Sequence, residues 1–229
     1  SMNREVDIEA GPGVFRHFRG YDLDAWTCLG EFVDNSLGSF LHSDTKKYFT
    51  QNNIQTSLEV TIHRNSGNKS IRIEDNAGGI SESDLDRALK IGDRPEQAKG
   101  FNEFGVGMKQ AALWFGNHFT VETSAIGELY ETTVDFNLKD IEENKVDVLR
   151  GEQVKESKAK LNDHYTKITI KDLNRMPPSG ARVIKEHLED TYRMQLRSGQ
   201  MEITIKTNNQ KKPLAFEEPD ILKKSYWAE

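Results

Sequence analysis

The chain has 229 residues, a formal net charge of -6 and 30% charged residues, a length that suits one large domain or one domain and the start of another. The acidic balance argues against tight nucleic-acid binding by this segment alone, although a longer protein could still contact nucleic acid elsewhere. No stretch has the length of a membrane span, and the one cysteine, Cys28, excludes an intrachain disulfide. We therefore expect an intracellular protein, cytoplasmic or nuclear.

Hydrophobic periodicity and turn residues predict alternating groups of helices and strands. In chain order we expect a helix over 24–41, strands over 58–64 and 70–75, a helix over 81–92, a helix over 105–116, strands over 118–126 and 128–136, a strand over 165–173, a helix over 180–197 and a strand over 201–206. Residues 92–104 contain Gly and Pro and predict a mobile loop. Residues 139–164 are charged and lack periodicity, which indicates a surface excursion.

The strands come in antiparallel-looking pairs rather than in strand–helix–strand repeats. This order predicts an α+β fold, a two-layer sandwich with a mixed, mostly antiparallel sheet and helices on one face. It argues against a doubly wound parallel sheet. We expect the domain to span 1–206. Residues 207–229 form a tail, and the aromatic residues Tyr226 and Trp227 near its end indicate that a further domain follows.

The sequence EFVDN places a carboxylate and an amide on one helix face. Glu31 and Asn35 are four residues apart, and Asp34 lies close by. An amide oxygen can ligate Mg²⁺, and a carboxylate can deprotonate a water molecule. The alternative is a solvated polar helix face, but this trio interrupts an apolar helix, which favours a cleft.

The sequence DNAGGI follows an alternating strand. Asp75 stands at the strand end and precedes two glycines, so a ligand could lie flat against bare backbone while the carboxylate accepts a hydrogen bond from an exocyclic amine. The alternative is an ordinary turn with an Asx hydrogen bond. Thr166 and Thr169, in the strand YTKITI, could place a hydroxyl beside Asp75, although β-branched residues are common in any strand.

The sequence GVGMK opens a helix with Gly-x-Gly and a lysine. Backbone N–H groups at a helix start attract anions, and Lys109 in the first turn makes sense if an anion binds there. The spacing matches neither a P-loop nor a dinucleotide-binding fingerprint. A tight connection remains the alternative for this motif taken alone.

In this order the motifs resemble the GHKL ATPase superfamily of gyrases, heat-shock chaperones, histidine kinases and MutL proteins. The resemblance spans about 24–173, and LGEFVDNSLGSF, IEDNAGGIS and FGVGMKQAAL are most similar to the microrchidia (MORC) branch and its bacterial relatives. It implies a Bergerat fold that binds ATP with Mg²⁺, closes a lid at 92–104, hydrolyses ATP slowly and forms an ATP-dependent homodimer. A nucleotide-gated scaffold with negligible hydrolysis, or a GHKL-type kinase, is the alternative.

The resemblance also implies site residues. Glu31 would activate the attacking water, Asn35 would ligate Mg²⁺, and Asp75 would bind the adenine amine. The other residues implied to bind the nucleotide are Ser39, Gly79, Ile80, Gly105, Val106, Gly107, Met108, Lys109 and Thr166.

Three positions depart from the family pattern. Many relatives have Asp at Gly38, Gly at Ala77 and Gly at Tyr165. The kinase alternative needs a phosphoacceptor histidine on an upstream helical pair. The 23 residues before the first expected helix, which include His17, are too few for one.

Overall fold

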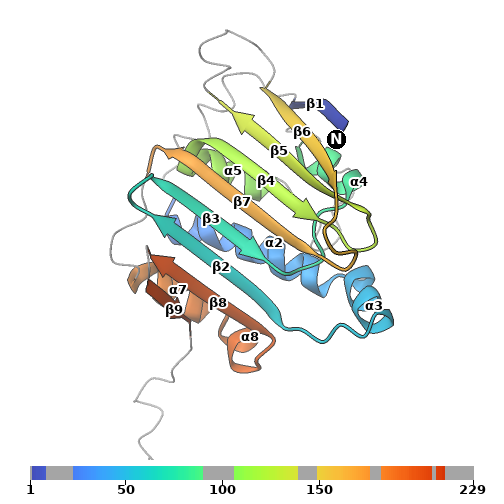
Figure 1. The fold of residues 1–229 in the computed structure, drawn as a ribbon. Coiled ribbons are helices and arrows are strands. Elements are labelled where there is room, and N and C mark those ends of the chain that lie inside the picture. The colour runs from blue at the N-terminus through green and yellow to red at the C-terminus, as the bar shows by residue number, and fades with distance from the viewer. Residues whose placement is uncertain are drawn as a thin grey trace, which may run out of the picture.

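The computed structural model describes residues 2–8, 23–89, 106–138, 149–175, 182–207 and 210–214. Its elements, labelled in Figure 1, are β1 (Met2–Ile8), α2 (Ala25–Leu41), α3 (Ser43–Gln51), β2 (Leu58–Asn65), β3 (Ser70–Asp75), α4 (Glu82–Leu89), α5 (Val106–Phe115), β4 (Gly116–Ser124), β5 (Tyr130–Asn137), β6 (Leu149–Ser157), β7 (Tyr165–Leu173), α7 (Arg182–Thr191), α8 (Arg193–Arg197), β8 (Met201–Thr207) and β9 (Gln210–Pro213).

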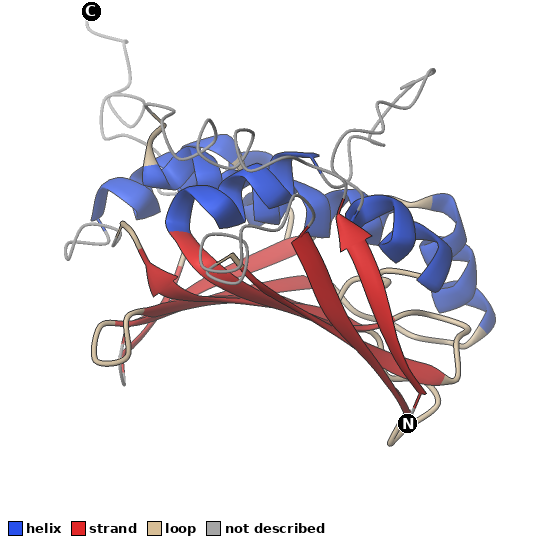
Figure 2. Cartoon of the chain, turned by 90° about the horizontal axis from the view of Figure 1, so that it is seen from above, coloured by secondary structure: helices blue, strands red, loops and turns tan. Residues whose placement is uncertain are grey.

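The described strands form one sheet in the order β1-β6-β5-β4-β7-β3-β2-β8-β9. Its neighbouring strands are antiparallel, except that β2 and β8 are parallel. Figure 2 shows the helices gathered over one face of this twisted sheet. The predicted α+β sandwich, with a mixed and mostly antiparallel sheet under helices on one face, is therefore confirmed.

The core lies between α2 and the middle of the sheet. The buried apolar residues of α2 recur every three or four positions and include Leu29, Phe32 and Val33. In β3 the alternating Ile71 and Ile73 are buried and pair in register with isoleucines of β7. Burying each such side chain contributes roughly 1.5–3 kcal/mol, so these rows fix the end of β3 beneath α2.

The prediction of a surface excursion over 139–164 is wrong, because β6 (Leu149–Ser157) pairs with both β1 and β5. The glycine Gly151 and the polar Gln153 occupy buried positions of this strand. Its sequence therefore lacks the alternation of apolar and polar residues that would predict a strand. Glycine is required at 151, since a Cβ there would lie 2.4 Å from Cε1 of Phe136. The sheet has room for the phenyl ring only where the neighbouring strand has no side chain.

Other short elements were also missed. The helix α3 buries only Thr45 and Phe49, too few residues to reveal a periodicity. The strands β1 and β9 lie at the two edges of the sheet, and β9 extends it past residue 206, where we had expected the domain to end. The helical stretch expected over 180–197 is divided between α7 and α8.

Several expectations fall on residues outside those described, namely the lid at 92–104, Gly105, His17 and the end of the tail. Cys28 is a free thiol buried in the core. Burial raises its pKa to about 12, so it remains a neutral apolar group. Among the described helices none has the length and apolar character to cross a membrane.

Candidate nucleotide site

The DNAGGI turn after β3 is held by a hydrogen bond from its own backbone and by another from a side chain of α2. The Asp75 carboxylate accepts a hydrogen bond from the Ala77 amide (2.9 Å) and another from the Ser36 hydroxyl (2.7 Å). The first is the Asx hydrogen bond of an ordinary turn. The second ties the turn to the helix that carries Glu31 and Asn35, so DNAGGI is both a turn and part of a larger polar arrangement.

Asp75 has an unusual protonation equilibrium. Burial raises its pKa to about 6, against the opposing effect of hydrogen bonds from Ser36 and from the backbone of Ala77 and Thr166. Because this pKa lies above that of an unfolded aspartate, about 4, its contribution to folding is largest below pH 4 and is lost as pH rises through 6. At neutral pH the carboxylate is therefore a poorly solvated acceptor that a ligand's N–H donor would stabilise.

Thr166 stands directly opposite Asp75 in the register of β3 and β7, as the expected site requires. It is buried on the helix-covered side. Its neighbour Tyr165 alternates to the other face, where Lys167 Nζ lies 4.3 Å from the ring centroid. This departure from the family pattern therefore leaves the threonine's place intact.

Side chains remote in the sequence hold the rest of the turn. Gly78 N donates to Ser39 Oγ (3.2 Å), and Ile80 N donates to Thr123 Oγ1 (2.8 Å). From the loop before β7, Nδ1 of His164 lies 2.9 Å from the carbonyl oxygens of both Asn76 and Ala77. An imidazole N–H directed at carbonyls requires the Nδ1-protonated form of His164.

Ser36, Thr123 and His164 were not singled out from the sequence. Each bonds to the turn from 39, 43 or 87 to 88 residues away. No local pattern marks such partners. The one available sign was weak, because Ser36 is a small polar residue among the buried positions of an apolar helix.

Gly79 is the turn residue for which glycine is required. Its φ is +73°, and a Cβ there would lie 2.1 Å from the carbonyl oxygen of Ser124. We expect Gly79→Ala to lower the free energy of unfolding by about 2–4 kcal/mol, measured by denaturant titration. The matched control is Gly127→Ala, at φ +74° with no described atom within 4 Å of the added carbon. It should cost about 1 kcal/mol, and equal losses in the two variants would contradict the steric explanation.

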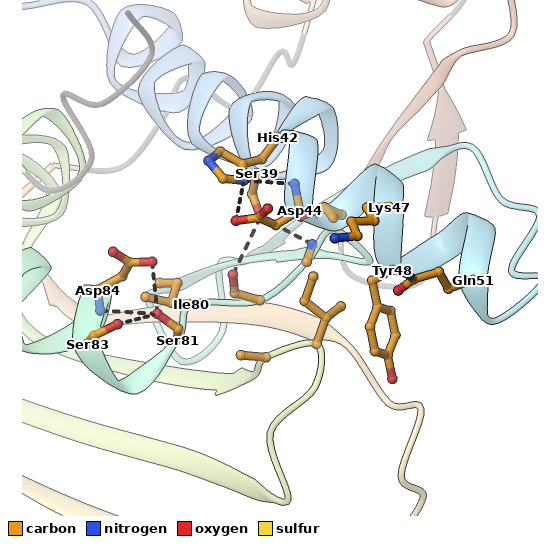
Figure 3. A pocket seen from close by; sticks show the side chains of 15 residues that line it. Ser39, His42, Asp44, Lys47, Tyr48, Gln51, Ile80, Ser81, Ser83 and Asp84 are labelled. Atoms are coloured by element: carbon orange, nitrogen blue, oxygen red, sulfur yellow. Dashed lines mark hydrogen bonds and ion pairs between the residues drawn. The ribbon is translucent and has the colours of Figure 1, made fainter. Parts of the chain in front are cut away.

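Gly79 and Ile80, together with Ser39, also line a cavity of about 660 Å³. Figure 3 shows Ser39 and His42 on one side of it and Ser81, Ser83 and Asp84 on the other. Asp75 and Thr166 are not among its lining residues, so the cavity adjoins the strand-end carboxylate without containing it. Ser81 Oγ accepts from Asp84 N (3.2 Å) and so caps the start of α4.

The helix α2 brings Glu31 against the start of α5. A Cβ on Gly107 would lie 2.1 Å from Oε2 of Glu31, so the carboxylate contacts the first turn of α5 at the glycine. The predicted helix opening is confirmed, because α5 begins at Val106. Met108 is buried in the core, which leaves its backbone as the part able to reach a ligand. Only the helical backbone is described for Val106 and Lys109.

Asn35 and Asp34 have different surroundings. Nδ2 of Asn35 is buried without a hydrogen-bond partner among the described residues, and such a group is costly unless something binds it. Asp34 instead accepts a hydrogen bond from the Tyr192 hydroxyl at 2.7 Å. The three polar residues of EFVDN therefore do not share one environment, since Asp34 is engaged by the α7–α8 segment.

The other two departures from the family pattern lie in packed positions. Gly38 and Ala77 are both buried. Ala77, whose N–H closes the Asx turn, is fully buried and adds a methyl group to the core.

The described residues form an α+β sandwich in which α2, the end of β3 and the start of α5 carry the three motifs. A family model described as histidine kinase-, DNA gyrase B- and HSP90-like ATPase matches residues 23–167, more than half of the chain. The chain belongs to this family. No curated protein gives a significant match. Membership indicates ATP binding and an ATPase or kinase type of chemistry.

Proposed function

We propose that this chain is the ATP-binding domain of a larger ATPase, which binds ATP with Mg²⁺ and hydrolyses it slowly. The observation that carries the proposal is the contact between the Glu31 carboxylate and Gly107 in the first turn of α5. A helix start attracts phosphate groups, so an acid held against it lies where a water could attack a terminal phosphate. Helix α2, which carries Glu31, also carries Asn35 one turn further along the chain.

The nucleotide base would lie at the DNAGGI turn. Asp75 would accept a hydrogen bond from the adenine amine, with Thr166 beside it and Ser39, Gly79 and Ile80 lining the pocket. The raised pKa of Asp75 and its fixed partners support this assignment, because a buried acceptor is stabilised by a donor.

The phosphates would lie at the start of α5. There the backbone amides of Gly105, Val106, Gly107 and Met108, with Lys109, would bind them, and residues 92–104 would form the lid. Gly105 and the lid lie outside the described residues.

Asn35 fits a role toward Mg²⁺. Its amide nitrogen is buried and unpartnered among the described residues, and an amide can turn by 180° to present its oxygen at that position. Mg²⁺ is usually held by few protein groups and shares its remaining ligands with phosphates and water. When bound it would supply charge neutralisation on the phosphates, while Glu31 orients and deprotonates the water.

We also propose that lid closure around ATP, with dimerisation, makes the domain a conformational switch. The three motifs LGEFVDNSLGSF, IEDNAGGIS and FGVGMKQAAL support the further proposal of a relationship to the MORC-like branch.

The test is to incubate the chain with Mg²⁺ and either ATP or a non-hydrolysable analogue, following phosphate release and mass in solution. We expect slow phosphate release from ATP and a dimer with both ligands. Dimerisation with no phosphate release above background would identify a nucleotide-gated scaffold instead. Transfer of labelled γ-phosphate to a protein side chain would identify a kinase.

A further inference from the structure

The segment between α7 and α8 reaches the helix that carries the proposed catalytic acid. Tyr192 is 3% exposed, and its hydroxyl lies 2.7 Å from Oδ1 of Asp34 and 3.1 Å from the carbonyl oxygen of Gly30. These two residues bracket a single helical turn, and Glu31 lies within that turn. The contact joins positions 158 residues apart in the chain.

The Tyr192 hydroxyl acts as a donor in this contact. Its pKa is raised, first by burial and then by the charges of Asp34 and Glu31, so the phenol keeps its proton at physiological pH. A hydroxyl has one proton to donate, and the charged carboxylate is the stronger and nearer acceptor. Tyr192 therefore fixes the Asp34 side chain and partly offsets its negative charge beside Glu31.

Contact with α5 limits the movement of the Glu31 carboxylate. Its Oε2 lies where a Cβ on Gly107 would be only 2.1 Å away, so α5 limits the carboxylate from one direction. On the other side α2 is held by the α7–α8 segment, through Tyr192 and through the stacked rings of Trp26 and His187, 4.1 Å apart. Both contacts therefore limit where Glu31 can lie.

We propose that Tyr192 is a positioning residue for ATP hydrolysis, which acts through Asp34 to hold the Glu31 turn of α2 in register with α5. The inference rests on the proposed function. Tyr192 lies outside residues 23–167, the span that the family model matches. The C-terminal part of the chain would thereby bear on the chemistry without touching the nucleotide.

The experiment compares Tyr192→Phe with the unmodified chain. The phenyl ring keeps its packing and only the hydroxyl is lost, so binding of a non-hydrolysable ATP analogue should change less than twofold. The turnover number should fall by about tenfold, as expected for a misplaced catalytic group. Turnover is normalised to the fraction of molecules that bind the analogue, which removes any effect of unfolded protein.

Two further variants sharpen the result. Asp34→Ala should lower turnover similarly, and the double variant with Tyr192→Phe should be no worse than either single change, because each change removes one end of the same hydrogen bond. Tyr130→Phe is the control, since it removes the hydroxyl of another tyrosine, one that is 49% exposed on β5 and does not line the cavity. It should leave turnover unchanged.

The outcomes separate the two proposals. Unchanged turnover in Tyr192→Phe, multiplicative losses in the double variant, or a parallel loss of turnover and analogue affinity would overturn the role of Tyr192 and leave the proposed function standing. Normal turnover in Glu31→Ala would overturn the proposed function itself, and the role of Tyr192 with it.

Discussion

Replacing Glu31 by alanine should lower ATP turnover by about 100-fold or more while leaving ATP affinity within about threefold. A general base contributes roughly 10²–10⁴ to the rate of proton transfer from an attacking water. Binding energy, by contrast, comes from the base and phosphate contacts, which the substitution leaves in place. Phosphate release measures turnover, and calorimetry with a non-hydrolysable analogue measures affinity.

A matched control is Asp24→Ala, which removes a carboxylate at the N-terminal end of α2, about two helical turns before Glu31. Asp24 occupies the N-cap of α2, but its side chain makes no capping hydrogen bond, so turnover should remain normal. Glu31→Ala with unchanged turnover would mean that the acid against α5 has no part in catalysis. A loss of analogue binding equal to the loss of turnover would assign Glu31 to binding instead.

Replacing Asp75 by asparagine should weaken ATP binding by about 10–100-fold. The carboxylate already accepts from Ser36 and from Ala77 N, and its remaining lone pairs are the acceptors proposed for the adenine amine. An asparagine keeps one acceptor oxygen and adds an N–H₂ group. With its oxygen on Ala77 N, it would direct a donor at a donor, which costs affinity without removing the turn.

The control for this prediction is Asp190→Asn, a change of the same chemistry at an exposed position of α7 that does not line the cavity, which should leave affinity unchanged. Preference for adenine over guanine nucleotides should also fall in Asp75→Asn. Retained ATP affinity in that variant would remove Asp75 from the base site and leave DNAGGI as a structural turn only.

The protonation of Asp75 gives a direct readout of the same site. In the free chain the carboxyl should titrate near its raised pKa of about 6. Bound ATP should lower that pKa, because a donated hydrogen bond favours the ionised form. Carbon-13 NMR of the aspartate carboxyl, assigned by its absence in Asp75→Asn, measures both values. An unchanged pKa with ATP bound would contradict contact with the adenine amine.

The sequence by itself determined the fold class and most of the elements. Apolar spacing in α2 and alternation in β3 and β7 record which face each element buries, because a periodicity of about 3.6 or 2 residues is a local property. The short motifs at the ends of these elements also indicated an ATP-binding family. The strand β6 escaped this reasoning because Gly151 and Gln153 occupy buried positions that apolar residues usually fill.

Only the tertiary structure decided how the candidate site is held. The sequence placed Glu31, Asp34 and Asn35 together, yet Tyr192 engages Asp34, Gly107 limits Glu31, and the amide nitrogen of Asn35 has no partner among the described residues. Ser36 and His164 fix the DNAGGI turn from elements far along the chain. Such contacts depend on how the helices pack on the sheet, and side chains brought together only by packing share no spacing that a linear pattern could show.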